Sequence, residues 1–238
     1  MKPLETQKYR NIIVLTGAGV SAASGLSTFR GPHGKWKHEL LAVSDGRQIP
    51  TMLPEMWRLY GKGRRALVGV QPNAAHLALA RWQKQWGEGR QITLVTQNVD
   101  GLHQKAGSPD VIEIHGSLLE TSCSNRDCPS KPFHDTSVPT EVPICPVCGS
   151  PLRPHVTLFH EPLPLEALHR VKKALRDCDL FIAIGTSGVV APASDFVRGA
   201  AYAGARTMNF NLTELEGHSP FQENYSGRAE EILPEWLD

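Results

Sequence analysis

Short runs of apolar, often β-branched residues alternate along this chain with longer stretches whose apolar residues recur at helical spacing. The short runs predict buried strands at residues 12–15, 92–96, 111–114, 180–184 and 206–211. The longer stretches predict helices at residues 52–67, 72–85, 165–176 and 196–203. Strands and helices in alternation are typical of a parallel sheet with helices on both faces, so we predict an α/β fold.

Small or polar residues follow four of the predicted strands. They occupy positions 17–19, 97–100, 185–187 and 211. The carboxyl ends of parallel strands line one edge of an open sheet, and ligands bind at that edge. We therefore expect these four segments to meet at a common binding crevice.

The first strand runs directly into a G-x-G-x-x-A pattern at Gly17, Gly19 and Ala22. In dinucleotide-binding folds the first glycine permits a tight turn and the second lets the backbone approach a pyrophosphate. The third small residue lets the following helix pack on the strand, and the amide end of that helix faces the phosphates. A tight strand–helix turn without a ligand is the alternative, but the position after the first strand favours a dinucleotide site.

The charge balance narrows the class of partner. The chain holds 25 Lys and Arg residues against 24 Asp and Glu residues, a formal net charge of +1. This balance gives no electrostatic reason to expect a nucleic-acid or membrane partner. No apolar run is long enough to span a bilayer, and the first ten residues lack the apolar core of a secretion signal. We therefore expect a cytoplasmic protein.

Four of the five cysteines form two close pairs. Four residues separate Cys123 from Cys128, two separate Cys145 from Cys148, and sixteen lie between the pairs. This spacing predicts a zinc ion held by four thiolates, a structural site because no position remains open for water. Unrelated cysteines are the alternative. Cys178, which precedes a predicted buried strand, is expected to be a structural thiol.

Interruptions in the strand–helix pattern suggest two domains. We predict a Rossmann-like, doubly wound parallel sheet built from residues 1–30, 70–117 and 153–238. A helical insertion at residues 31–69 and a zinc-binding module at residues 118–152 are expected to form a second, smaller domain.

Several segments taken together resemble the sirtuins, a family of NAD-dependent protein-lysine deacylases. They are GAGVSAASGLSTFRG, TQNVDGLHQKAG, IEIHG, the two cysteine pairs, LRPHV and GTS, and they span about residues 11–231. FRGPHGKWK and QPNAAHLALA are most similar to the bacterial-type branch that includes desuccinylases. The resemblance implies an enzyme that uses NAD as co-substrate, moves the acyl group of a modified lysine to ADP-ribose, and releases nicotinamide and O-acyl-ADP-ribose.

The resemblance also implies roles for individual residues. His115 in IEIHG matches the catalytic base, and an imidazole suits that role because it accepts a proton near neutral pH. A structural histidine at a strand end is the alternative. The implied catalytic set is His115, Asn98, Asp100 and Arg30. The implied cofactor-binding residues are Gly17, Ala18, Gly19, Ala22, Thr28, Phe29, Arg30, Trp36, Gln97, Asn98, Asp100, His115, Gly185, Thr186, Ser187, Asn211 and Ala229. The implied substrate-binding residues are Tyr60, Arg64, Val156, Phe159 and His160.

Two other activities could use the same pocket. One is mono-ADP-ribosyl transfer or NAD hydrolysis, and the other is NAD sensing without catalysis. The intact IEIHG and LRPHV segments favour deacylation, and a pure sensor has no need for His115. The implied partner is the acylated lysine of a protein substrate, and we expect the enzyme to act as a monomer.

One departure from the family pattern concerns the acyl group. Desuccinylases carry a Tyr-x-x-Arg pair for an acidic acyl tail, but here the third position after Tyr60 is Gly63, and Arg64 follows it. One residue of slip turns a helical side chain by about 100°. We therefore expect a broad or short-acyl preference unless Arg64 compensates for the slip.

Three further departures lie elsewhere. His160 stands where relatives carry a glycine, and it could narrow the acyl channel, add a polar contact or point to solvent. Ala191 replaces a common tyrosine, which would open space. Thr213 replaces a common acidic residue, which would weaken the contact with the adenosine ribose.

Overall fold

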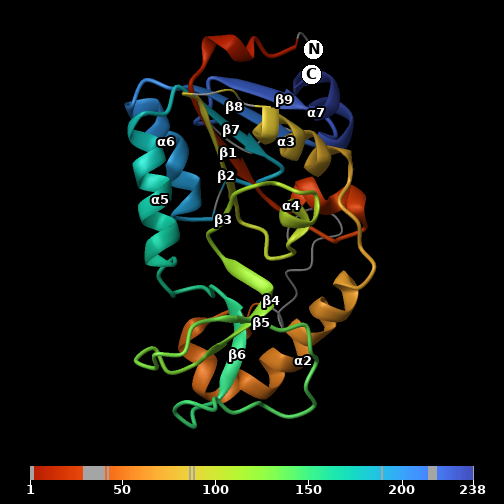
Figure 1. Cartoon of the computed structure of the whole chain (residues 1–238), viewed down its shortest axis with the longest axis vertical. Helices are drawn as coiled ribbons and strands as arrows, with labels where there is room; N and C mark the ends of the chain where they lie inside the picture. The colour runs from red at the N-terminus through yellow and green to blue at the C-terminus, as the bar shows by residue number, and fades with distance from the viewer. Residues whose placement is uncertain are drawn as a thin grey trace.

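The computed structural model describes residues 3–28, 41, 43–85, 87, 89–188, 190–213 and 219–237. The chain forms a larger lobe around one sheet and a smaller lobe around another (Figure 1). Phe29, Arg30 and Trp36, for which cofactor contacts are expected, lie outside the described residues.

The larger lobe is built on a six-stranded sheet in the order β3-β2-β1-β7-β8-β9, and every neighbouring pair is parallel. The predicted α/β class with a doubly wound sheet is confirmed. Its strands are β1 (Asn11–Thr16), β2 (Gln91–Thr96), β3 (Val111–Glu113), β7 (Leu180–Ile184), β8 (Arg206–Asn211) and β9 (Glu223–Ser226). Because β1 lies between β2 and β7, the strand order reverses beside it, which is where such sheets open a binding crevice.

Helices cover both faces of this sheet (Figure 1). On one face lie α5 (Leu165–Arg176) and α6 (Phe196–Tyr202), which pack on Ile13, Val95 and Phe181. On the other lie α3 (Ala74–Gln85) and α7 (Ala229–Leu237), which pack on the opposite side chains of the same strands. Alternate residues of a strand point to opposite faces, so an almost continuously apolar strand is what this three-layer arrangement requires. No helix of the described ranges is long and apolar enough to cross a membrane.

The helix expected after β1 is present as a 3-10 helix, η2 (Ala18–Ser24), that ends at Gly25 in the left-handed conformation. Val20 and Ser21 are the buried residues of η2, whereas Ala22 is exposed. The expectation that Ala22 packs the helix against the strand is therefore wrong, because the tighter turn of a 3-10 helix directs different positions inward.

The smaller lobe combines an antiparallel sheet with α2 (Ile49–Leu67). Its strands are β4 (Gly116–Cys123), β5 (Phe133–His134) and β6 (Leu152–Val156), in the order β5-β4-β6. Leu53 and Met56 of α2 pack with Leu118 and Val156 of the sheet. Because β6 pairs with β4, this sheet extends past the boundary expected at residue 152.

The connection between the two sheets is very short. β3 ends at Glu113 and β4 begins at Gly116, so only Ile114 and His115 lie between them. Thr157, just after β6, donates its backbone N–H to the carbonyl oxygen of His115 at 2.8 Å. His115 is thus held at the crossing point of the two lobes. The remaining short helices are η1 (Thr6–Lys8), η3 (Gly46–Gln48), α4 (Leu102–Lys105) and η4 (Ala193–Asp195).

Candidate active site

Hydrogen bonds join the ends of the four central strands into one edge. Gln97 donates its N–H to Thr16 O at 2.9 Å, and Gly17 donates to Ile184 O at 3.0 Å. Gly185 in turn donates to Phe210 O at 2.8 Å. The segments that follow the four strands are therefore neighbours, as the sequence predicts.

Two side chains reinforce this edge. Gln97 donates from Nε2 to Thr186 Oγ1 at 2.8 Å, and Asn211 donates from Nδ2 to Thr186 O at 2.7 Å. Thr186 is buried between them, whereas Ser187 is exposed. Thr186 thus links the turns after β2, β7 and β8.

The glycines after β1 and β7 let two backbones touch. A Cβ atom on Gly17 would lie 2.7 Å from Gly185 O, and one on Gly19 would lie 2.7 Å from Gly185 Cα. A Cβ on Gly185, whose φ is +62°, would lie 2.6 Å from the nitrogen of Val20. Gly19 also donates its N–H to Gly185 O at 2.9 Å. The close approach that requires these glycines is therefore an approach between two loops of this chain.

His115 is oriented by one backbone bond. Its Nδ1 lies 3.0 Å from the carbonyl oxygen of Gln97. A carbonyl oxygen can only accept, so Nδ1 carries the proton and Nε2 holds the lone pair. Burial lowers the pKa of His115, although the bond to Gln97 opposes that shift. The imidazole is therefore neutral near pH 7 and can accept a proton at Nε2.

Asn98 and Asp100 are held by Ser21, which sequence reasoning missed. Asn98 donates from Nδ2 to Gly17 O and to Ser21 Oγ, each at 3.1 Å, and this leaves its amide oxygen as an acceptor. Ser21 donates its hydroxyl to Asp100 Oδ2 at 2.7 Å. Burial raises the pKa of Asp100, while the bonds from Leu102 and Ser21 favour its charged form. A carboxyl and an amide are thus placed side by side near the end of β2.

Two buried histidines lie beneath these residues. His76 Nδ1 accepts from the N–H of Asn73 at 3.3 Å, so its Nε2 carries the proton that reaches Ser21 Oγ at 3.3 Å. His103 Nε2 lies 2.9 Å from Thr16 Oγ1, and its ring centroid is 4.8 Å from that of His76. Burial lowers the pKa of His76 to about 4 and that of His103 to about 3. The sequence holds one signal for a buried histidine here, which is His76 inside the otherwise apolar run AAHLALA.

The remaining expected cofactor residues lie around this edge. Ala18 and Gly19 are partly buried at the start of η2, and Thr28 is partly buried after it. Ala229 is the first residue of α7, a helix that contacts η2, and it packs against the core. Its expected proximity to the adenine remains a prediction.

Arg64 does not face an acyl site. It is 3% exposed, and its guanidinium donates to Leu118 O, Glu120 O and Ser137 O, each at 2.8 Å. The two further bonds go to Thr121 Oγ1 at 2.8 Å and Asp135 Oδ2 at 3.0 Å. An arginine has five N–H donors, and these five bonds all lie inside the smaller lobe. The expectation that Arg64 binds substrate is therefore wrong.

Tyr60 lies in an apolar setting. It packs against a buried cluster of Leu53, Met56, Leu118, Val156 and Leu158, and its hydroxyl lies 3.3 Å from Ser44 Oγ. Val156 pairs with Gly116, the residue after His115. An apolar cluster therefore begins next to the candidate base.

The four paired cysteines form one cluster. Their sulfur atoms all lie within 4.8 Å of one another, with 3.5 Å between Cys123 and Cys148 and 3.8 Å between Cys128 and Cys145. Tetrahedral zinc with bonds of about 2.3 Å to sulfur needs sulfur pairs about 3.8 Å apart. The residues fit a zinc ion. Cys145 and Leu152 pack beneath Trp57 of α2, whose Nε1 donates to Leu152 O at 2.9 Å, so the cluster supports the fold of this lobe.

The comparison with known protein families agrees with this geometry. The model of the Sir2 family matches residues 17–192, which takes in the glycine turn, His115 and all four clustered cysteines. The chain belongs to the Sir2 family.

Similar proteins support the assignment to the Sir2 family over nearly the whole chain. A protein of Pasteurella multocida named NAD-dependent protein deacylase is 41% identical over 236 residues, 97% of each chain. The crystal structure of a Sir2 homologue–NAD complex has a TM-score of 0.86 and 32% identity, and covers 99% of this chain and 94% of its own. A Sir2 protein with a deacetylated p53 peptide and 3'-O-acetyl ADP-ribose has a TM-score of 0.84 and 31% identity, over 96% of this chain and 93% of its own.

The strand-end edge of this Sir2 protein fits a dinucleotide. It presents neutral amides at Gln97, Asn98 and Asn211 and a hydroxyl at Thr186, which suit ribose hydroxyls and a carboxamide. Asp100, partly buried beside them, adds carboxyl oxygens that can accept hydrogen bonds from a ligand.

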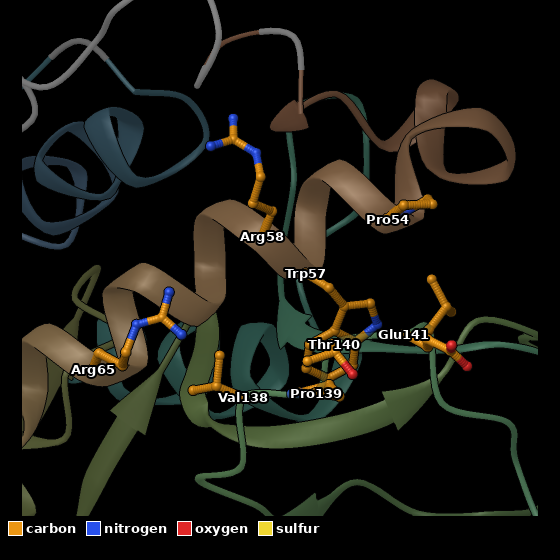
Figure 2. A pocket seen from close by; sticks show the side chains of 9 residues that line it. Pro54, Trp57, Arg58, Arg65, Val138, Pro139, Thr140 and Glu141 are labelled. Atoms are coloured by element: carbon orange, nitrogen blue, oxygen red, sulfur yellow. The ribbon is translucent and has the colours of Figure 1, made fainter.

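A separate cavity of about 510 Å³ lies on the smaller lobe (Figure 2). It is lined by α2 residues, including Trp57 and Arg65, and by residues 138–142, which follow β5. Figure 2 shows the Arg58 side chain pointing away from Val138 and Pro139. Within the described part of the chain, no residue of the strand-end edge lines this cavity. The cavity is therefore distinct from the candidate active site.

Proposed function

We propose that this protein is an NAD-dependent protein deacylase that removes acyl groups from lysine side chains. The observation that carries the proposal is the position of His115. It lies beside the converged strand ends, with Nδ1 fixed by Gln97 and Nε2 left as a base. The relative named as a deacylase and the peptide-bearing Sir2 structure support a modified protein as the substrate.

NAD, when bound, supplies the nicotinamide–ribose bond that is broken and the ADP-ribose that accepts the acyl group. His115 Nε2 would accept a proton from a hydroxyl placed beside it, and burial, which lowers the pKa of the imidazole, keeps the ring neutral for that role. Asn98 offers its amide oxygen to orient a polar hydrogen of the cofactor or a water. Ser21 and His76 hold Asp100 and Asn98 in place from below.

We further propose that the enzyme prefers neutral acyl groups. Arg64 has no donor left for an acyl carboxylate, and Gly63 brings no side chain to the position three after Tyr60. A Cβ on Gly63 would lie 2.9 Å from a methyl group of Leu118, so this side of α2 faces apolar atoms. An unpaired carboxylate placed there would lose hydration without a compensating bond.

The structural role of zinc and a cytoplasmic location are parts of the same proposal. Four cysteine ligands leave no open coordination site, so the ion would stabilise the smaller lobe. Free thiolates that are kept for a metal are typical of a reducing compartment.

A mass-spectrometric assay tests the proposed function. One lysine peptide is prepared with acetyl, succinyl and longer aliphatic groups and incubated with the enzyme, with and without NAD. We expect NAD-dependent loss of the neutral acyl groups together with equal amounts of nicotinamide and O-acyl-ADP-ribose. Nicotinamide release with an unchanged peptide mass would indicate NAD hydrolysis, and a heavier peptide would indicate ADP-ribosyl transfer.

A further inference from the structure

The chain after β6 is paired with the segment before η3. Phe159 donates its N–H to Ser44 O at 2.7 Å, and Gly46 donates its N–H to Phe159 O at 2.9 Å. Asp45 and Phe159 therefore form a parallel bridge outside the named strands. Because a backbone has one N–H per residue, the donor of Phe159 is not available to an incoming peptide.

This bridge is close to the candidate base. Thr157, two residues before Phe159, donates its N–H to the carbonyl oxygen of His115. Phe159 is 37% exposed, so it contributes to the surface near that point. A peptide that binds here as an added strand must pair with backbone N–H and C=O groups that the Asp45–Phe159 bridge does not already use. The positions of those backbone groups depend on how firmly residues 44–46 are held.

His160 occupies a backbone conformation that favours glycine. Its φ is +65°, the left-handed region, and it is the only non-glycine residue with positive φ in the described part of the chain. Glu161 donates its N–H to Leu158 O at 3.1 Å, so His160 sits inside a tight turn. A non-glycine residue is retained in such a conformation only where the surroundings stabilise it.

The imidazole of His160 makes one contact that can stabilise this backbone conformation. His160 Nδ1 lies 3.1 Å from Asp45 Oδ1, although the His160 side chain is 53% exposed. Asp45 also accepts from the N–H and the guanidinium of Arg47, and these bonds hold the pKa of Asp45 well below its usual range. The acceptor therefore stays charged, and His160 is held to the centre of the bridge rather than pointing freely to solvent.

We propose that His160 is a positioning residue for the peptide substrate, because its bond to Asp45 holds residues 44–46 against Phe159. The inference rests on the proposed deacylase function. In this role His160 acts through Asp45 and not on the reacting atoms. It fixes the surface next to His115 that the proposed function assigns to the acyl-lysine peptide.

Steady-state kinetics on two variants tests the proposal. In His160→Gly the backbone strain and the imidazole are both removed. We expect KM for an acetyl-lysine peptide to rise about three- to tenfold, the effect of losing about one net hydrogen bond. We expect kcat and KM for NAD to stay within about twofold of wild type and Tm to stay equal or rise. His160→Asn is the matched control, because asparagine tolerates positive φ and can donate to Asp45. It should restore KM to within about twofold.

A double-mutant cycle locates the effect at Asp45. Asp45→Ala should raise KM for the peptide, and adding His160→Gly should raise it no further. Additive effects, or a His160→Gly enzyme with wild-type KM, would overturn the positioning role while leaving deacylation intact. A wild-type enzyme that does not deacylate any peptide would instead reject the proposed function.

Discussion

His115 Nδ1 donates to the carbonyl oxygen of Gln97 at 3.0 Å, and this bond selects the tautomer in which Nε2 is the base. Because Gln97 also lies on the edge formed by the strand ends, the base and the cofactor groove are fixed by the same residue. Catalysis and cofactor binding can still be separated by mutation, because the proposed proton transfer uses only Nε2.

Replacing His115 with Ala should lower kcat/KM for deacylation by roughly 100- to 10,000-fold, the usual contribution of a general base. NAD affinity, measured by calorimetry, should change little, since the amides and hydroxyls of the edge remain. His169→Ala on the exposed surface of α5 is the matched control and should be fully active. Undiminished turnover in His115→Ala would contradict the assignment of the base.

Replacing Arg64 with Met should lower the free energy of unfolding by about 3–5 kcal/mol, because a buried charge network loses one partner and Asp135 is left uncompensated. Urea denaturation measures the change. Arg65→Met changes the next residue of α2, which is exposed, and should lower the free energy of unfolding far less. The ratio of acetyl to succinyl turnover should not move in either variant. A succinyl activity that disappears only in Arg64→Met would show that Arg64 reaches the acyl group after all.

Replacing Gly63 with Arg places a guanidinium close to one helical turn after Tyr60, the spacing that an acidic acyl tail requires. We expect succinyl-lysine turnover relative to acetyl-lysine turnover to rise at least about tenfold, because a carboxylate gains a charged partner. Gly63→Ala controls for the contact with Leu118, and its ratio should equal that of wild type. A folded Gly63→Arg variant that shows no gain would place the acyl tail elsewhere.

Replacing Cys145 with Ser should release zinc and unfold the smaller lobe, because thiolate binding contributes directly to its folding. Metal content by mass spectrometry and Tm by calorimetry report the two effects, and a strong chelator should reproduce them in the wild type. Cys178→Ala removes a thiol outside the cluster and should keep the full zinc content. Unchanged metal content in Cys145→Ser would rule out the four-thiolate site.

The buried histidines predict acid sensitivity. The pKa of His76 falls to about 4 and that of His103 to about 3 in the folded chain, below the value of about 6.5 in an unfolded one. At a pH between the folded and unfolded pKa values, the unfolded state therefore binds more protons. The contribution of these histidines to the free energy of unfolding is complete above about pH 6.5 and is lost as the pH falls toward about 4. Burial raises the pKa of Glu113 to about 7, so this carboxyl favours the folded state as the pH falls. It offsets only part of the loss, because it is one group against two histidines.

Urea unfolding at several pH values from neutral to about 4 measures this loss. His76→Gln keeps a donor for Ser21 but does not titrate, so its stability should depend less on pH than that of the wild type. His169→Gln makes the same replacement at an exposed position of α5 and serves as the matched control. A wild-type profile that stays flat over this range would mean that the two rings are not buried as neutral groups.

The parts of the site that the sequence predicts correctly depend on local patterns. Strand ends at Gly17, Gln97, Gly185 and Asn211 follow from apolar runs and from the rule that parallel strands share an edge. The cysteine cluster follows from spacing alone. Both signals are contained in a few consecutive residues.

The parts that it does not predict depend on distant partners. Arg64 finds its acceptors 54 to 73 positions away, on β4 and the loop after β5, so the fold does not make the substrate contact that the family resemblance implies for it. His76 and Ser21 are 55 positions apart, and only the packing of α3 on the sheet brings them together. The expected packing of Ala22 on the strand is wrong because a 3-10 helix turns Val20 and Ser21 inward instead.

The placement of His115 between β3 and β4 has a mechanical consequence. Because only two residues join the sheets there, and Thr157 donates to the same carbonyl from the returning strand, the backbone of His115 is tied to both lobes. A shift of the smaller lobe relative to the larger sheet would therefore also move the imidazole relative to the strand ends. The alignment of the candidate base is thus coupled to the position of the lobe that carries the cysteine cluster.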